Sequence, residues 1–227
     1  MSYTSLVLFD IDKTLIHSTE GHKDAFSEAF RAVYGIPTEM DLVKHNGMTD
    51  QAIIYAVLTE AGLSEAEIAA KIPECMQVMD AYYLTNCMRN TITPMDGVLE
   101  LLAELKQHDV LMGLVTGNLE AIARAKMKQI GANDYFLVGG FGSDHISRAE
   151  LVRIATKKAV ENCGFVVSDN VFLVGDTPKD IAAGIEAGVK TIGVAGGINS
   201  VADLTAAQAD FVLISLLEKE RFLEIVT

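Results

Sequence analysis

The sequence has few cysteines and an excess of acidic over basic residues. Its three cysteines are an odd number and form no CxxC pair, so we expect reduced thiols and neither a disulfide framework nor a structural zinc site. The sequence contains 18 Lys and Arg residues and 31 Asp and Glu residues, which gives a formal net charge of −13. This acidity argues against a nucleic-acid backbone or an anionic membrane surface as the main partner.

The sequence also lacks long apolar runs, internal repeats and low-complexity tracts. No run has the length of a membrane span. The first residues contain no basic segment and reach Asp10 after only four apolar residues, which is unlike a signal peptide. We therefore expect a cytoplasmic protein that binds no nucleic acid and no membrane, and that is a monomer or a homodimer.

Short apolar runs alternate with amphipathic, helix-like stretches along most of the chain. The runs occupy residues 6–9, 110–115, 171–174, 191–194 and 211–214, and their unbroken apolar character is typical of strands buried on both faces of a parallel sheet. Helical patterns occupy residues 96–108, 119–130, 147–162 and 178–187. The alternation predicts an α/β domain with a doubly wound parallel sheet.

Residues 17–92 break this alternation. Segments 20–34, 50–61 and 64–87 all have helical patterns, and no apolar strand separates them. We therefore predict an α/β core made of residues 1–16 and 93–227, with a helical cap of residues 17–92 inserted after the first strand.

Polar residues follow three of the predicted strands at the point where each strand ends. These residues are Asp10, Asp12 and Thr14 in the first segment, Thr116, Gly117 and Asn118 in the second, and Asp176 and Asp180 in the third. Ligands of an open parallel sheet bind at the carboxyl ends of its strands, so neighbouring strands would gather four carboxylates in one site. Carboxylates this close repel one another unless a cation lies among them, and such oxygen ligands suit Mg²⁺.

These segments resemble the motifs of the haloacid dehalogenase superfamily, whose members are mostly phosphatases. Residues 9–15 (FDIDKTL) resemble its first motif, residues 114–118 (LVTGN) its second and residues 174–180 (VGDTPKD) its fourth. The helical insertion lies where this family places one type of cap. Residues 47–50 resemble the cap loop of phosphoglycolate-phosphatase-like members. The resemblance implies a Rossmann-like core and a Mg²⁺-dependent phosphatase that acts on a small phosphorylated metabolite.

The resemblance also implies roles for individual residues. Asp10 would be the nucleophile that forms an aspartyl-phosphate, and Asp12 would be the general acid and base. Thr116 and the backbone N–H groups of Gly117 and Asn118 would hold the transferring phosphoryl group. The metal ligands would be Asp10, the backbone carbonyl of Asp12 and Asp176, with Asp180 either a further ligand or a residue that supports the ligands.

Two positions depart from the family pattern. Lys13 stands where the family's phosphatases usually have glycine, and is either a cation near the phosphate or an exposed loop residue. The third motif normally supplies a lysine before a helix. Here Arg148 is the preferred candidate, with Lys157 and Lys158 as alternatives.

Further residues are less closely defined by the sequence. In the cap, Thr49 is a candidate substrate contact, together with Asp50 and Arg89. The five histidines show no ligand spacing and are expected on the surface or in loops.

Several other functions share parts of this pattern. A calcium loop starting at Asp10 is disfavoured because Leu15 and Gly21 occupy the positions of its glycine and glutamate. A phosphomutase of the β-phosphoglucomutase kind uses the same two aspartates and stays open. A haloacid dehalogenase typically lacks an acid at position 12. A non-catalytic phospho-receiver or binding module is about half this length and has no helical insertion.

Overall fold

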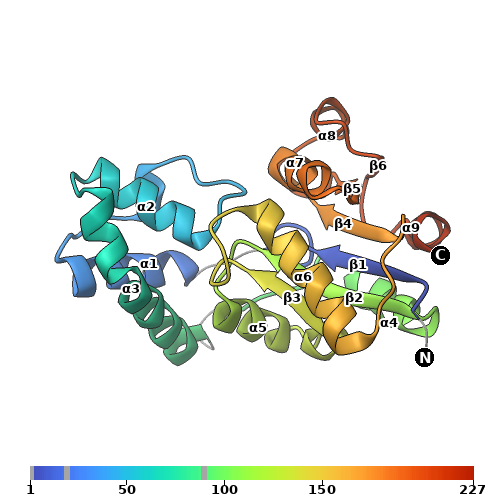
Figure 1. Cartoon of the computed structure of the whole chain (residues 1–227), viewed down its shortest axis with the longest axis horizontal. Coiled ribbons are helices and arrows are strands. Elements are labelled where there is room, and N and C mark those ends of the chain that lie inside the picture. Colours follow the sequence, from blue (N-terminus) through green and yellow to red (C-terminus); the bar gives the residue numbers. More distant parts are fainter. Residues whose placement is uncertain (1–2, 18–20, 88–90) are drawn as a thin grey trace.

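The computed structural model describes residues 3–17, 21–87 and 91–227 of the chain. A parallel α/β core carries a group of helices at one end (Figure 1). Arg89, the proposed substrate contact, and Glu20, the first residue of a predicted helix, lie outside the described residues. No helix of the described segments is both long and apolar enough to cross a membrane.

The core is a six-stranded, all-parallel sheet in the order β3-β2-β1-β4-β5-β6. Its strands are β1 (Ser5–Phe9), β2 (Val110–Thr116), β3 (Val138–Phe141), β4 (Val171–Gly175), β5 (Lys190–Val194) and β6 (Phe211–Leu213). This arrangement confirms the predicted doubly wound sheet. It also confirms that β1, β2 and β4, whose ends carry the polar motifs, are direct neighbours.

Helices cover both faces of the sheet (Figure 1). They are α4 (Val98–Gln107), α5 (Glu120–Gln129), α6 (Arg148–Cys163), α7 (Pro178–Ala187), α8 (Val201–Ala206) and α9 (Lys219–Val226). Successive β1 residues point to opposite faces, so Val7 and Phe9 pack with α4, α5 and α9, while Leu6 and Leu8 pack with α6 and α7. Burial on both faces is why these strands have no polar alternation.

Strand β3 was not among the predicted strands. Its sequence, Val-Gly-Gly-Phe, holds two glycines, which weaken the apolar pattern that marks the other strands. The structure explains Gly140, because a Cβ atom there would lie 2.0 Å from the carbonyl oxygen of Leu151 in α6. The glycine allows α6 to pack directly on the strand.

The cap consists of α1 (His22–Ala29), which continues as a π-helical turn over Phe30–Tyr34, α2 (Asp50–Glu60) and α3 (Glu65–Asn86). It has its own apolar core, in which Phe26, Phe30 and Met79 are fully buried. Leu119, just before α5, and Ile122 of α5 belong to the same cluster. The cap therefore rests on α5, while its boundaries at residues 17 and 92 stay a prediction.

Lys13 has a left-handed backbone, with φ at 69°. A side chain there is strained by about 1–2 kcal/mol, whereas glycine adopts this conformation freely. The same turn returns Ile16 to pair with Asp12 and with Pro94. The turn geometry therefore accounts for the glycine expected at this position.

We predict that the free energy of unfolding of Lys13→Gly is about 0.5–1 kcal/mol higher than that of Lys13→Ala, since only glycine relieves the strain of the left-handed backbone. Both variants remove the ammonium group, so the pair isolates the backbone effect. Urea unfolding followed by circular dichroism measures the difference. Equal stabilities would show that the turn relaxes around a side chain at no cost.

Candidate active site

The carboxyl ends of β1, β2 and β4 meet at one edge of the sheet and gather the predicted residues. Asp10 follows β1 directly, Thr116 is the last residue of β2, and Asp176 follows β4. All three are buried, with at most 4% of their surface exposed. The parallel register, in which Phe9 pairs with both Leu114 and Val174, brings these strand ends to the same level.

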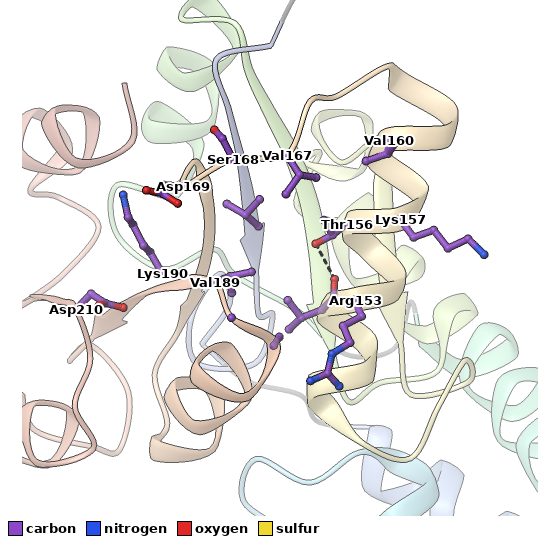
Figure 2. Close-up of a pocket in the computed structure, with 14 residues that line it drawn as sticks. Arg153, Thr156, Lys157, Val160, Val167, Ser168, Asp169, Val189, Lys190 and Asp210 are labelled. Carbon is purple, nitrogen blue, oxygen red and sulfur yellow. Dashed lines mark hydrogen bonds between the residues drawn. The ribbon is translucent and has the colours of Figure 1, made fainter.

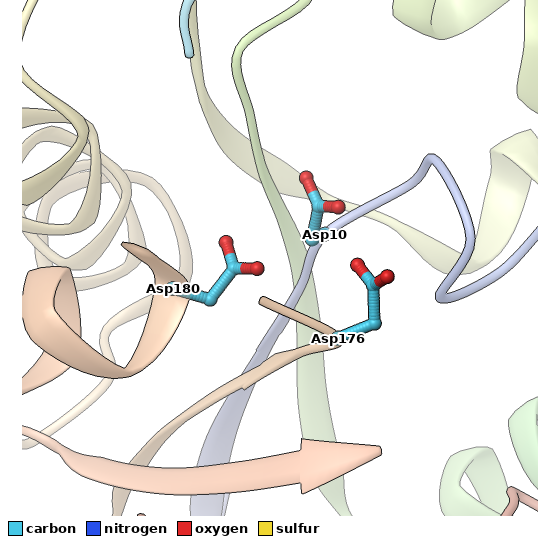
Figure 3. Close-up of side chains that lie close together, drawn as sticks. All are labelled: Asp10, Asp176 and Asp180. Atoms are coloured by element: carbon cyan, nitrogen blue, oxygen red, sulfur yellow. The ribbon is translucent and has the colours of Figure 1, made fainter. Parts of the chain in front are cut away.

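Three carboxylates form a compact group at this edge (Figure 3). Asp10, Asp176 and Asp180 each offer an oxygen within 4.8 Å of the others. Asp180 lies in the first turn of α7, where its Oδ2 accepts hydrogen bonds from the backbone N–H (3.1 Å) and hydroxyl (2.6 Å) of Thr177. This capping box fixes Asp180 and aims its other oxygen into the group, which we call the carboxylate cluster.

Arg148, the first residue of α6, supplies the cluster's positive charge. Its Nη1 donates to Asp10 Oδ1 at 3.1 Å and also contacts Asp180 Oδ1. Lys157 instead pairs with Glu161 at 3.7 Å on an exposed face of α6, and Lys158 donates to the carbonyl of Gly139 at 2.9 Å. Of the three cations considered for the third motif, only Arg148 lies at the cluster.

Burial and mutual repulsion shift the acidity of the cluster. Burial raises the pKa of Asp10 well above its ordinary value; Arg148 opposes the shift, and Asp180, Asp12 and Asp176 add to it. Burial, followed by the charge of Asp180, raises the pKa of Asp176 to about 7. When all three carboxylates are ionised, the cluster carries more negative charge than its one arginine balances, and the raised pKa values reflect this repulsion.

The residues of the cluster fit a hard divalent cation. The Oδ1 atom of Asp176 is buried and has no hydrogen-bond partner among the described residues, which is costly unless another group meets it. Carboxylate oxygens are donors that suit Mg²⁺, whose remaining positions are usually filled by waters and phosphate oxygens. The carboxylate of Asp12 is directed elsewhere, so only its backbone carbonyl remains a proposed ligand.

The Asp12 carboxylate lies in a separate group of polar side chains. Its Oδ2 accepts from Asn118 Nδ2 at 2.6 Å, and its Oδ1 accepts from Lys126 Nζ at 2.9 Å. Burial by itself would raise the pKa of Asp12, but Lys126, His22 and the Asn118 hydrogen bond outweigh it and lower that pKa. Two aspartates only two residues apart thus have opposite shifts.

The loop after β2 lies directly under the cap. Asn118 also donates from Nδ2 to the hydroxyl of Thr116 at 2.7 Å, which fixes both side chains. The carbonyl of Gly117 accepts from the backbone N–H of Asp50 at 2.8 Å. A Cβ at Gly117 would lie 2.4 Å from the Met48 carbonyl oxygen, so only glycine permits this approach.

The cap residues proposed as substrate contacts are placed differently from one another. Thr49 is 2% exposed; its hydroxyl caps α2 and donates to the Ile146 carbonyl at 2.9 Å. A cavity lies at the carboxyl ends of β1, β2 and β4. Thr49 does not line this cavity, whereas Asp50 and Lys13 do. A contact between Thr49 and a substrate stays a prediction, and so does one from Lys13, whose ammonium donates to the His17 carbonyl.

Lys126 and His22 were missed by the sequence analysis. Lys126 is completely buried, and His22, expected on the surface or in a loop, is 6% exposed and pairs with Asp50 Oδ2 at 3.1 Å. A signal for Lys126 was present: Ile122, Lys126 and Ile130 stand four residues apart, so the lysine interrupts an apolar helix face. No comparable pattern marks His22.

Two cavities lie at opposite edges of the sheet. One, of about 350 Å³, is lined by Asp10, Asp12, Arg148 and Asp176 from the core and by His22, His45 and Met48 from the cap. The other, of about 530 Å³, is lined by residues such as Val171, Val189, Lys190 and Asp210 (Figure 2). These residues lie where β4, β5 and β6 begin. The smaller cavity is the candidate active site because ligands of such sheets bind at the carboxyl ends.

Comparison with known proteins agrees with this geometry. A family model described as haloacid dehalogenase-like hydrolase matches residues 7–194. A phosphoglycolate phosphatase from Pectobacterium atrosepticum is 30% identical over 90% of this chain and 86% of its own length. An N-acetylmuramic acid 6-phosphate phosphatase from Pseudomonas aeruginosa is 28% identical over 84% and 81%.

A crystal structure of a predicted phosphatase from Clostridium acetobutylicum has a TM-score of 0.72 at 21% identity, covering 98% of this chain and 100% of that chain. This structural likeness supports the fold. The relatives support the enzyme class, a phosphoric monoester hydrolase. Since the family model covers most of the core and the cap, the chain belongs to the haloacid dehalogenase-like hydrolase family.

Proposed function

We propose that this protein is a Mg²⁺-dependent phosphatase that hydrolyses a small phosphorylated metabolite through a phosphoryl group carried on Asp10. One observation carries the proposal. Asp10 lies against Arg148 in the carboxylate cluster, while Asp12, two residues on, is held in a separate environment. The fold thus places two carboxyl groups in different surroundings side by side, one proposed as the nucleophile and the other as the group that transfers protons.

The proposed reaction has two steps. A carboxylate oxygen of Asp10 attacks phosphorus, and the bond from phosphorus to the leaving oxygen breaks as Asp12 transfers a proton to that oxygen. Asp12 then takes a proton from a water molecule that attacks the same phosphorus. The Asp10–phosphoryl bond breaks, which restores Asp10 and releases inorganic phosphate.

The chain's own donors are suited to hold the phosphoryl group. The proposed contacts are Thr116, the N–H groups of Gly117 and Asn118, and Arg148, all from residues that line the cavity, with Lys13 and Thr49 as additional proposed contacts. A bound Mg²⁺ would neutralise negative charge on the phosphate and on Asp10, Asp176 and Asp180. These local cations matter because the net charge of −13 cannot attract an anionic substrate.

The size of the cavity supports a small substrate. Its volume of about 350 Å³ is near the lower end for ligand sites. Phosphoglycolate is the first substrate to test, because of the cap loop at residues 47–50 and the phosphoglycolate phosphatase relative. The second relative is named for a phosphorylated sugar derivative, so a screen should include both kinds.

The screen measures release of inorganic phosphate from a panel of phosphorylated metabolites, with and without Mg²⁺. Product analysis accompanies each active compound. Transfer of the phosphoryl group to a second position of a sugar phosphate, without phosphate release, would identify a phosphomutase instead.

We predict that Asp10→Asn lowers kcat by at least roughly 10⁴-fold, because the amide cannot act as the nucleophile. Asp169→Asn is the matched control: it makes the same change at an exposed position near the larger cavity and leaves turnover unchanged. Circular dichroism verifies that both variants fold. Turnover retained by folded Asp10→Asn would exclude Asp10 as the nucleophile.

The raised pKa of Asp176 leads to a prediction about metal binding. In the folded protein the Asp176 carboxyl group keeps its proton up to about pH 7. In the unfolded chain the same group releases the proton near its ordinary pKa of 3.8. The metal-free protein should therefore lose stability as pH rises from about 4 to about 7. Mg²⁺ should restore stability mainly above this window, where the carboxylates are ionised.

Thermal unfolding monitored at about pH 5 and about pH 8, each with and without Mg²⁺, measures the effect. The metal-induced rise in Tm should be larger at the higher pH and should shrink in Asp176→Asn. Sodium chloride at equal ionic strength is the control. An equal rise in Tm at both pH values would contradict the prediction.

A further inference from the structure

A buried lysine of α5 lies beside the active site without touching the carboxylate cluster. The side chain of Lys126 is completely buried. Its Nζ lies 2.9 Å and 3.2 Å from the two oxygens of Asp12, 2.5 Å from Asn118 Oδ1 and 3.4 Å from His22 Nδ1. A buried ammonium is costly to desolvate, so each of these contacts offsets a penalty.

The surrounding helix does not need a charge at this position. Lys126 shares a buried helix face with Ile122 and has Met127 as its neighbour in sequence, and both are fully buried. An apolar side chain of the same length would continue this face without desolvating an ion. The charge of Lys126 is therefore better explained by the polar groups that it binds than by a contribution to the stability of the fold.

The contacts of Lys126 hold the Asp12 carboxylate from one side. Lys126 meets both carboxylate oxygens, and Asn118 donates to Oδ2 at 2.6 Å while accepting from Lys126. This three-membered arrangement leaves the carboxylate little freedom to rotate. It also ties Asp12 to Asn118, whose backbone belongs to the proposed phosphoryl-binding loop.

The same arrangement reaches the cap. His22 of α1 lies against Lys126, and its Nε2 lies 3.1 Å from Asp50 Oδ2. That oxygen also accepts from the backbone N–H of Leu119, at 2.9 Å, just before α5. The contact between cap and core therefore helps to fix the position of Lys126. Through Lys126 it also helps to fix the position of Asp12.

We propose that Lys126 is a positioning residue that aims the Asp12 carboxylate at the leaving oxygen of the substrate when the cap is in place. The inference rests on the proposed function, because it assigns Asp12 the proton transfer. Lys126 contacts the Asp12 carboxylate and would act on the substrate only through it.

The test compares Lys126→Met on two kinds of substrate. An alkyl phosphate has a poor leaving group and needs protonation, whereas p-nitrophenyl phosphate has a good one and needs little. Lys126→Met should lower kcat on the alkyl phosphate by about 100-fold or more and on p-nitrophenyl phosphate by less than about 10-fold, with little change in KM. Lys128→Met, on the exposed face of the same helix, is the control and should change neither.

A double-mutant cycle tests whether Lys126 acts through Asp12. In an Asp12→Asn background, Lys126→Met should lower the residual turnover of p-nitrophenyl phosphate no further. Equal losses on both substrates in the single variant, or the same loss with and without Asp12, would overturn the inference.

A failure to fold and a failure of the proposed function can both be distinguished from a failure of this inference. If Lys126→Met does not fold, Lys126→Gln keeps a polar group and should lower the ratio of alkyl to aryl turnover, while an unchanged ratio overturns the inference. A wild-type protein that hydrolyses no phosphomonoester would refute the proposed function together with this inference. An active wild type whose leaving-group preference is insensitive to Lys126 would refute this inference alone.

Discussion

The candidate active site depends on carboxylates that the fold brings together despite their repulsion. Asp10, Asp176 and Asp180 reach the same point because β1 and β4 are adjacent parallel strands and α7 begins directly after β4. Folding must stabilise this arrangement from elsewhere, and the sheet does so through strands buried on both faces. Arg148 offsets part of the repulsion, and the remaining charge is what suits the site to a divalent cation.

The separation of Asp10 from Asp12 is the second condition for the proposed chemistry. The left-handed turn at Lys13 directs the chain back after Asp12. The two acids of this motif, Asp10 and Asp12, contact different partners. Asp10 faces other carboxylates and Arg148, which together with burial raises its pKa. Asp12 faces Lys126 and Asn118, which lower its pKa against the effect of burial. Environment, rather than residue type, distinguishes the two. The proposed reaction starts with Asp10 ionised and Asp12 protonated, which these shifts oppose, so a bound Mg²⁺ would have to favour the ionised form of Asp10 and the bound phosphate the protonated form of Asp12.

The sheet and most of the carboxylate site could be predicted from sequence because both follow from strand ends. An apolar run that stops at a polar residue identifies Asp10, Thr116 and Asp176 without further information. Strand β3 was missed because its glycines serve close packing by α6 rather than an apolar pattern. Lys126 and His22 were missed because their partners come from distant segments, and helical periodicity says nothing about which side chains meet across the contact between cap and core.

The close approach of Gly117 to Met48 has a consequence for selectivity. The peptide group between Gly117 and Asn118 is hydrogen-bonded on both sides: its N–H, proposed to bind the phosphoryl group, donates to the Thr116 hydroxyl at 3.3 Å, and its carbonyl accepts from Asp50 of the cap. A bulky ester that displaced the cap would disturb the same peptide group that is proposed to bind its phosphate. Discrimination by size would then appear in the rate of the chemical step as well as in binding, so large esters would be poor substrates even at saturation.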